Sequence, residues 1–418
     1  MLLAGACAPC PPTAPCPQAP STPPPPASTN RILTPATPES VGMSTRRLED
    51  VFARIEQRVK DNLFPGAVAL VARHGRIVGH RAFGNKTRGG NEPVTLDTIF
   101  DLESMTKVLA TAISALVLVQ LGKMRLDDPV VRYLPAFTGE GKDRVTVADM
   151  LRYSAGLPVD NQFLDVPDRD EVFRRMAETP LEYPPGTKAQ YSDLTYRLLG
   201  RVIEAAADAS LYAFASEHVW KPLGMFDTLY TPPPALVPRI AATGHSSVRQ
   251  RVVRGEVQDE QDYALGGVCG CDGVFSTAKD VATFAQMILD GGTYAGVRVL
   301  DAKLAAAMVR NQTPWTREEE TDVSPMSNLL FTPKGYGWEL FTSRFSNGGT
   351  RLMPGSFGKI GGAGTVFWID PHRKLVAVLL TNHGLPVPFD EPNWNQLIYT
   401  LGSGEFFDGV VNAVIGHA

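Results

Sequence analysis

The feature that most constrains this chain is a largely apolar run, residues 108–121, that ends at Gly122. Such a run predicts a helix buried in the core of a large domain. Ser104 falls on its first turn and Lys107 three residues later, so the two side chains lie on one helix face. A serine hydroxyl is a poor nucleophile, but a desolvated lysine can take its proton. The pattern therefore predicts a nucleophilic serine.

The spacing Ser-x-x-Lys occurs a second time, at residues 276–279. There Thr277 and Asp280 fit a capping box, in which the Thr277 hydroxyl accepts from a backbone amide and Asp280 reaches back. The second match is explained by the start of a helix. Ser104 and Lys107 have no comparable explanation, so they are the candidates for chemistry.

Composition limits the class of protein. The chain has 418 residues, of which 44% are hydrophobic and 20% charged, which is typical of a globular protein with a sizeable core. Its formal net charge of -4 gives no reason to expect nucleic acid as a partner. No run of 18 uncharged apolar residues is present, so the sequence predicts no membrane-spanning helix.

The five cysteines do not form a disulfide framework, because three lie within the first sixteen residues. The other two, Cys269 and Cys271, are separated by one glycine. They are either a metal or redox pair or two small residues in a tight glycine-rich loop. No second Cys/His pair at ligand spacing and no His-Glu-x-x-His accompany them, which favours the loop. We therefore expect no metal and no cofactor.

Residues 1–34 are predicted to be a disordered, proline-rich tail. Just before the prolines, Leu3-Ala-Gly-Ala-Cys7 resembles the end of a bacterial lipoprotein signal. One interpretation is that Cys7 is lipidated and tethers the protein to a membrane, which would place it in the periplasm or at the bacterial membrane. The other is a plain disordered tail, which is compatible with a cytoplasmic protein.

The folded part is expected to be one domain, residues 35–418. Strands are predicted near both ends of it, and residues between about 105 and 335 are mainly helical. The arrangement indicates an α/β (α+β) fold, in which one antiparallel sheet is built from both termini and a helical lobe is inserted. The predicted strands are residues 67–72, 76–83, 337–341, 356–360, 365–369 and 375–380, and a closing helix is predicted at 394–401.

Further motifs occur in a fixed order around the Ser104 segment. From about Pro38 to residue 400 the chain resembles the class C β-lactamase-like and penicillin-binding-protein family of serine hydrolases, which implies a two-lobed fold with helices flanking the sheet. The resemblance rests on the motifs Leu126-Asp-Asp-Pro-Val130, Tyr133-Leu-Pro135, Pro184-Pro-Gly186, Tyr191-Ser-Asp193, Pro222-Leu-Gly-Met225, Gly273-Val-Phe-Ser-Thr277 and Phe357-Gly-Lys-Ile-Gly-Gly-Ala-Gly-Thr365.

The family's second motif, Tyr-x-Asn, corresponds here to Tyr191-Ser-Asp193. The resemblance implies that Tyr191 lies beside Ser104 and Lys107 and shares the proton transfer. A phenol can serve as a base only if nearby cations stabilise the phenolate. Asp193 departs from the family's asparagine, because an ionised carboxylate only accepts hydrogen bonds. It would hold Lys107 as an ammonium, which leaves open whether Lys107 or Tyr191 is the base.

The third motif, Lys-Thr-Gly, is Lys359-Ile360-Gly361 here. By resemblance Lys359 contributes a positive field over the site, and Gly361 lets the backbone approach the substrate. Ile360 lacks the hydroxyl that helps this family to hold a substrate carboxylate, which costs about 1–3 kcal/mol of substrate binding. The resemblance also places the oxyanion between the N–H groups of Ser104 and Gly362.

These departures favour an esterase-like hydrolase that forms an acyl-enzyme on Ser104. The alternatives are a D-amino-acid peptidase or D,D-carboxypeptidase, then a β-lactamase, and a binding protein with impaired turnover. The expected substrate is a small ester or a short, peptidoglycan-like peptide. Asp193, Lys359 and Gly361 are the predicted substrate-binding residues, and Ser104, Lys107, Tyr191 and Gly362 are the predicted catalytic residues.

Overall fold

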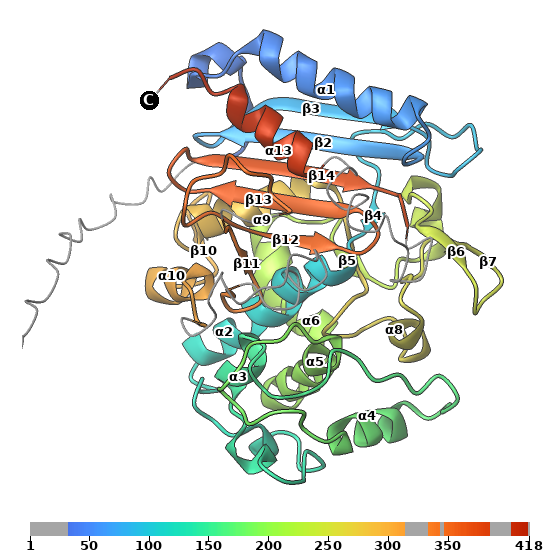
Figure 1. Cartoon of the computed structure of the whole chain (residues 1–418), viewed down its shortest axis with the longest axis vertical. Helices are drawn as coiled ribbons and strands as arrows, with labels where there is room; N and C mark the ends of the chain where they lie inside the picture. Colours follow the sequence, from blue (N-terminus) through green and yellow to red (C-terminus); the bar gives the residue numbers. More distant parts are fainter. Residues whose placement is uncertain (1–31, 314–332, 343–346, 385–402, 417–418) are drawn as a thin grey trace, which may run out of the picture.

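A computed structural model describes residues 32–313, 333–342, 347–384 and 403–416. Its largest sheet has seven strands in the order β1-β3-β2-β14-β13-β12-β11, so strands from both ends of the chain lie side by side (Figure 1). All neighbours in this sheet are antiparallel except β1 and β3. The strands are β1 (Thr34–Pro35), β2 (Gly66–Arg73), β3 (Arg76–Gly84), β11 (Glu339–Leu340), β12 (Phe357–Gly361), β13 (Thr365–Asp370) and β14 (Leu375–Thr381).

The junction between the two ends of the chain is the pairing of β2 with β14, which runs from Leu375 opposite Arg73 to Thr381 opposite Ala67. Every residue of both strands is buried. Side chains on β2 alternate between the two cores, because successive residues of a strand point to opposite faces. Each fully buried Val or Leu contributes about 1.5–3 kcal/mol, which explains the continuous apolar sequence.

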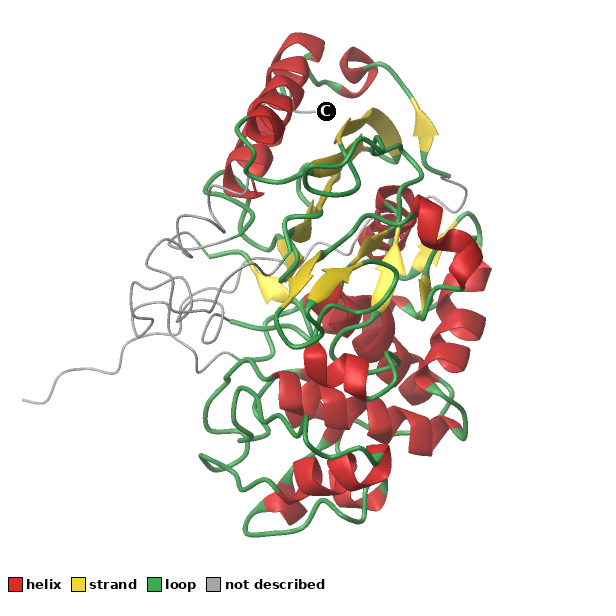
Figure 2. Cartoon of the chain, turned by 90° about the vertical axis from the view of Figure 1, so that its right-hand side faces the viewer, coloured by secondary structure: helices red, strands yellow, loops and turns green. Residues whose placement is uncertain are grey.

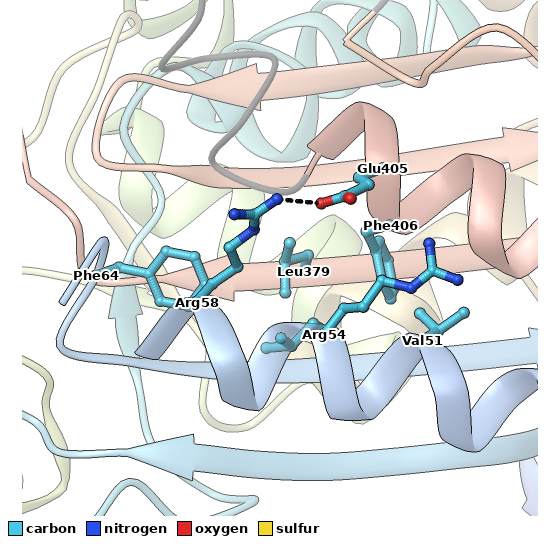
Figure 3. A pocket seen from close by; sticks show the side chains of 8 residues that line it. Val51, Arg54, Arg58, Phe64, Leu379, Glu405 and Phe406 are labelled. Carbon is cyan, nitrogen blue, oxygen red and sulfur yellow. Dashed lines mark hydrogen bonds and ion pairs between the residues drawn. The ribbon is translucent and has the colours of Figure 1, made fainter. Parts of the chain in front are cut away.

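One face of the sheet is covered by helices from the two termini, α1 (Thr45–Lys60) and α13 (Ser403–Asn412). Ser44 caps α1 by accepting from the backbone N–H of Arg47. Figure 3 shows Arg58 of α1 reaching Glu405 of α13, at 2.8 Å. The cavity beneath this pair holds about 10 Å³, room for a single water and no more.

The other face carries α9 (Ala278–Leu289), and beyond it lies the inserted, largely helical lobe (Figures 1 and 2). The segment Glu103–Gln120 at its centre is long and apolar enough to cross a membrane, but 83% of it is buried within the fold. The sequence predicts no span here, and the segment packs as a core helix. The other helices of the lobe include α3 (Val147–Leu151), α4 (Arg169–Glu178), α5 (Asp193–Ala207), α6 (Leu211–Ala215) and α8 (Glu260–Ala264).

Some sequence expectations need correction. The predicted strand 337–341 is paired only at Glu339–Leu340. Thr277 caps α9 by accepting from the Asp280 N–H at 3.3 Å, but the Asp280 carboxylate accepts from the Asp227 N–H and the Thr228 hydroxyl, so the capping box is only half made. Leu33 is already buried in the fold, and its N–H donates to the Tyr294 hydroxyl.

Three expectations concern residues that the structure does not describe. Cys7, the body of the proline-rich tail and the predicted helix at 394–401 all lie outside the described ranges. The helix that does close the chain within those ranges is α13.

Candidate active site

The segment that carries Ser104 is clamped to a small three-stranded sheet. Strand β4 (Phe100–Asp101) pairs with β8 (Val274–Ser276), which also pairs with β5 (Leu229–Tyr230). The Leu102 N–H donates to the Val274 carbonyl at 2.9 Å, and the Val274 N–H donates to the Thr106 hydroxyl at 3.0 Å. Two hydrogen bonds thus fix the chain on either side of Ser104.

The expected α-helix does not begin at Ser104. Residues Glu103–Met105 form a 3₁₀ turn, Lys107–Ala112 a π-helical turn, and the regular helix α2 covers Ile113–Gln120. Glu103 has a φ of 48°, a left-handed conformation that is costly for a residue with a side chain. Irregular helical turns and backbone strain are often found at functional sites, where they orient a side chain. Here they orient the side chain of Ser104.

Ser104 is partly exposed, while Lys107 is fully buried beneath it. The ammonium of Lys107 donates to Ser104 Oγ at 2.8 Å, and the hydroxyl of Tyr191 donates to the same oxygen at 2.8 Å. The structure therefore brings together the serine, the lysine and the tyrosine that the sequence selects, although they are up to 87 positions apart.

Lys107 is surrounded by acidic groups. Its ammonium lies 2.7 Å from Asp193 Oδ1, 3.9 Å from Asp272 Oδ1 and 3.0 Å from the Cys271 sulfur. Burial lowers the pKa of Lys107, but Asp193 and Asp272 outweigh it, so the pKa lies well above its usual value. The predicted grip of Asp193 on Lys107 is present in the structure.

Asp193 is held in place by the start of α5. Ser192 caps this helix by accepting from the Thr195 N–H at 3.0 Å, and the Asp193 N–H donates to the Val159 carbonyl. Burial would raise the pKa of Asp193, but Lys107 and then Arg197 lower it to about 2. Asp193 is therefore an acceptor at every ordinary pH.

Tyr191 is buried between aromatic and cationic neighbours. Its ring stacks on Tyr153 at 5.2 Å, and the ammonium groups of Lys107 and Lys359 lie 5.0 and 4.9 Å from its centroid. Burial and then Asp193 raise the pKa of the Tyr191 phenol well above its usual value, against the effect of Lys107. The resting state thus holds a neutral phenol beside an ammonium.

Lys359 lies on β12, fully buried, and its ammonium contacts Glu339 Oε1 at 2.6 Å. Gly361 follows on the same strand. A Cβ there would stand 2.2 Å from the Leu102 carbonyl, so only glycine lets β12 dock against the turn that carries Ser104. This docking is the role that packing gives Gly361, and its predicted contact with substrate stays a prediction.

Gly362 follows Gly361 directly and is half-buried. Gly361 lies against Leu102 and Glu103, so Gly362 follows a residue that packs on the turn carrying Ser104. The position suits a pair of amides facing one oxyanion. Their joint role stays a prediction from the resemblance.

The position of Cys271 beside Lys107 is not apparent from the sequence. Its loop is tight, as expected, because a Cβ on Gly270 would stand 2.2 Å from the Tyr196 carbonyl of α5. The approach brings the buried Cys271 thiol to Lys107, where it donates toward Asp193 Oδ1 at 3.2 Å and Asp272 Oδ2 at 3.1 Å. The only signal in the sequence was the crowding of glycines around Cys-Gly-Cys.

Asp262, Cys271 and Asp272 could offer ligand atoms to a metal, since these atoms lie within 4.8 Å of one another. Two cations already contact the group. Arg197 donates to Asp262 at 2.5 Å, and Lys107 contacts the Cys271 sulfur. A metal ion bound here would be repelled by Arg197 and Lys107. The three groups are therefore better suited to pairing with these two side chains than to binding a metal.

A larger groove of about 640 Å³ lies between α4, α5 and the loop before Cys269. Arg169 and Arg201 line it, but Glu204 lies within ion-pair distance of both. Neither this groove nor the small cavity under α1 is lined by Ser104, Lys107 or Tyr191.

Comparison with known proteins identifies the family to which this serine, lysine and tyrosine belong. The sequence profile of the β-lactamase family matches residues 51–400. The "Putative D-alanyl-D-alanine carboxypeptidase" of Escherichia coli K12 is 31% identical over 411 residues, which cover 89% of this chain and 90% of that protein. The chain therefore belongs to the β-lactamase family, and it is a serine hydrolase with a β-lactamase-like fold.

Solved structures show the same fold at lower identity. EstCE1, described as a hydrolase with promiscuous acyltransferase activity, superposes with a TM-score of 0.66 at 21% identity and covers 89% of this chain and 99% of its own. A LovD6 mutant of simvastatin synthase from Aspergillus terreus gives 0.67 at 22% identity, over 87% of this chain and 96% of its own. At these identities the likeness establishes the fold alone.

Proposed function

We propose that this protein hydrolyses carboxylic esters through an acyl-enzyme formed on Ser104. One observation carries the proposal: Ser104 Oγ lies 2.8 Å from both the Lys107 ammonium and the Tyr191 hydroxyl. A serine activated by adjacent titratable groups is the arrangement that nucleophilic acyl transfer requires.

The proton path follows from this geometry. Attack starts from the form in which the Lys107–Tyr191 pair has lost one proton. The pair then takes the Ser104 proton while Oγ bonds to the ester carbonyl, and the N–H groups of Ser104 and Gly362 stabilise the oxyanion. The pair returns the proton to the leaving alcohol, and a water molecule attacks the acyl-enzyme by the same route.

Two residues favour an ester over a lactam or a peptide. Asp193 stands where an amide could donate to an amide carbonyl, and a carboxylate with a pKa of about 2 cannot donate. Ile360 offers no hydroxyl to a substrate carboxylate. A D,D-carboxypeptidase is the second candidate, because the Escherichia coli relative carries that name.

The test is hydrolysis of p-nitrophenyl butyrate, a chromogenic cephalosporin and a peptide ending in D-Ala-D-Ala. We expect Ser104→Ala to lower kcat on the ester by about 10⁴-fold or more, the scale of nucleophile knock-outs. Ser276→Ala is the matched control, since Ser276 belongs to the second Ser-x-x-Lys and should retain activity. Full activity in Ser104→Ala contradicts the mechanism, and faster cleavage of the peptide would favour the carboxypeptidase. Failure of a fluorophosphonate to label Ser104 would favour a binding protein.

We also propose that Cys7 is lipidated and that the protein is attached to a bacterial membrane. The support is the sequence Leu3-Ala-Gly-Ala-Cys7 before a proline-rich spacer. Fatty-acid labelling that persists in the Cys7→Ala variant would contradict this.

A further inference from the structure

Glu339 stands out because it pairs with a lysine that the site would otherwise present to substrate. It lies on β11, opposite Gly358 of β12, and its carboxylate contacts the ammonium of Lys359, the next residue of β12. Both carboxylate oxygens have partners. Oε1 accepts from Lys359 at 2.6 Å, and Oε2 accepts from the Asn347 amide at 3.2 Å. Glu339 is 5% exposed and Lys359 fully buried, so water does little to screen the pair.

The pair lies next to the reacting groups. The Lys359 ammonium is 4.9 Å from the centroid of the Tyr191 ring, and the Tyr191 hydroxyl donates to Ser104 Oγ. An unpaired ammonium at this place would attract a substrate carboxylate. With Glu339 in contact, an entering carboxylate would have to replace a short charge-assisted hydrogen bond and would also meet the repulsion of Glu339.

A second buried lysine, Lys334, pairs with Glu339 through the backbone, in the isolated antiparallel bridge Lys334↔Glu339. Burial lowers the pKa of Lys334 to about 7, with Glu339 opposing and Lys359 adding to the effect. Lys334 is therefore largely neutral at pH 8, and Glu339 retains its contact with Lys359.

We propose that Glu339 is a specificity-determining residue: it neutralises Lys359 and so disfavours ester substrates that carry a carboxylate. The inference rests on the proposed ester hydrolysis and names its substrate class. Ile360 already disfavours a carboxylate-bearing substrate because it lacks a hydroxyl. Glu339, on another strand, is a second reason.

The test compares two esters of equal chain length at pH 8, p-nitrophenyl hexanoate and mono-p-nitrophenyl adipate. The wild type should prefer the hexanoate by about tenfold or more in kcat/KM, which corresponds to 1.4 kcal/mol. In Glu339→Gln this preference should shrink at least tenfold, because the variant removes the carboxylate that pairs with Lys359 and repels a substrate carboxylate. Glu339→Asp, which keeps the carboxylate, is the matched control and should retain most of the preference.

Taking the ratio for one preparation cancels any difference in folded fraction. An unchanged ratio in active Glu339→Gln overturns the inference, and so does a wild type that cleaves the adipate ester as fast as the hexanoate. The wild-type ratio decides the question even if Glu339→Gln does not fold. If the wild type cleaves neither ester, the proposed function itself has failed, which is a separate outcome.

Discussion

Two buried lysines lie against the ring of Tyr191 at nearly equal distances, 5.0 Å for Lys107 and 4.9 Å for Lys359. Their surroundings differ. Lys107 comes from the helical lobe and has several acidic neighbours, of which Asp193 is in contact at 2.7 Å. Lys359 comes from the sheet, and its counterion is Glu339 at 2.6 Å.

The difference shows how neighbours decide what a buried lysine can do. Burial lowers the pKa of both groups. Around Lys107, Asp193 and Asp272 outweigh burial and raise the pKa well above its usual value. Around Lys359, Glu339 does not outweigh burial, and the pKa lies below its usual value. The surroundings of Lys107 therefore keep it protonated beside Ser104, whereas Lys359 serves as the counterion of Glu339.

Among changes that test the comparison of the two lysines, the largest effect should come from Tyr191, whose ring lies near both ammonium groups. Tyr191→Phe keeps the ring between them but removes the hydroxyl 2.8 Å from Ser104 Oγ. We expect kcat on p-nitrophenyl butyrate to fall about 10²–10⁴-fold, as for the loss of a general acid–base group. Tyr153→Phe, in the ring stacked on Tyr191, is the control and should stay close to wild type. Equal activity of the two variants would leave Lys107 as the base.

Asp193→Asn sharpens the comparison, because it removes the carboxylate that contacts Lys107 and leaves Glu339, the counterion of Lys359, in place. Asp193 raises the pKa of both Lys107 and Tyr191, so its loss lowers both. A base is lost as the pH falls through its pKa. The acid limb of the kcat/KM profile should therefore move to lower pH, whichever of the two is the base. Asp170→Asn, at an 82% exposed side chain, is the control. If the acid limb of the kcat/KM profile does not move, neither Lys107 nor Tyr191 determines its position.

The Lys107 side of the site could largely be predicted from sequence. Ser104 and Lys107 are three residues apart, so helix periodicity alone joins them, and Tyr191 and Asp193 follow from the order of the family's motifs. The sheet was equally accessible, because apolar strands of predictable length stand at both ends of the chain. The start of the Ser104 helix differs from the regular α-helix that the sequence predicts, because tertiary contacts with β8 accompany a 3₁₀ and a π-helical turn there.

The Lys359 side could not be predicted in the same way. Glu339 is separated from Lys359 by 20 positions, and their contact depends on the register of β11 against β12. Cys271 reaches Lys107 only because the glycine-rich loop passes directly over α5. No local pattern encodes such contacts, because packing between distant segments creates them.

The smallest effect should be a pH dependence of selectivity on the Lys359 side. The pKa of Lys334 is about 7, so this group gains a proton as the pH falls from 8 to 6. The added charge beside Glu339 should attract a carboxylate, which stays ionised in this range. We expect the wild-type preference for p-nitrophenyl hexanoate over the adipate ester to weaken about threefold, a small electrostatic effect at the effective dielectric of a protein site.

Lys334→Met should make this preference independent of pH between 6 and 8, while the common titration of Lys107 and Tyr191 cancels in the ratio of the two esters. Glu339 raises the pKa of Lys334 and Lys359 lowers it, and the Tyr153 ring lies 6.0 Å from the Lys334 ammonium. A pH dependence that persists in Lys334→Met would show that another titratable group sets it, and would contradict the role given to Lys334.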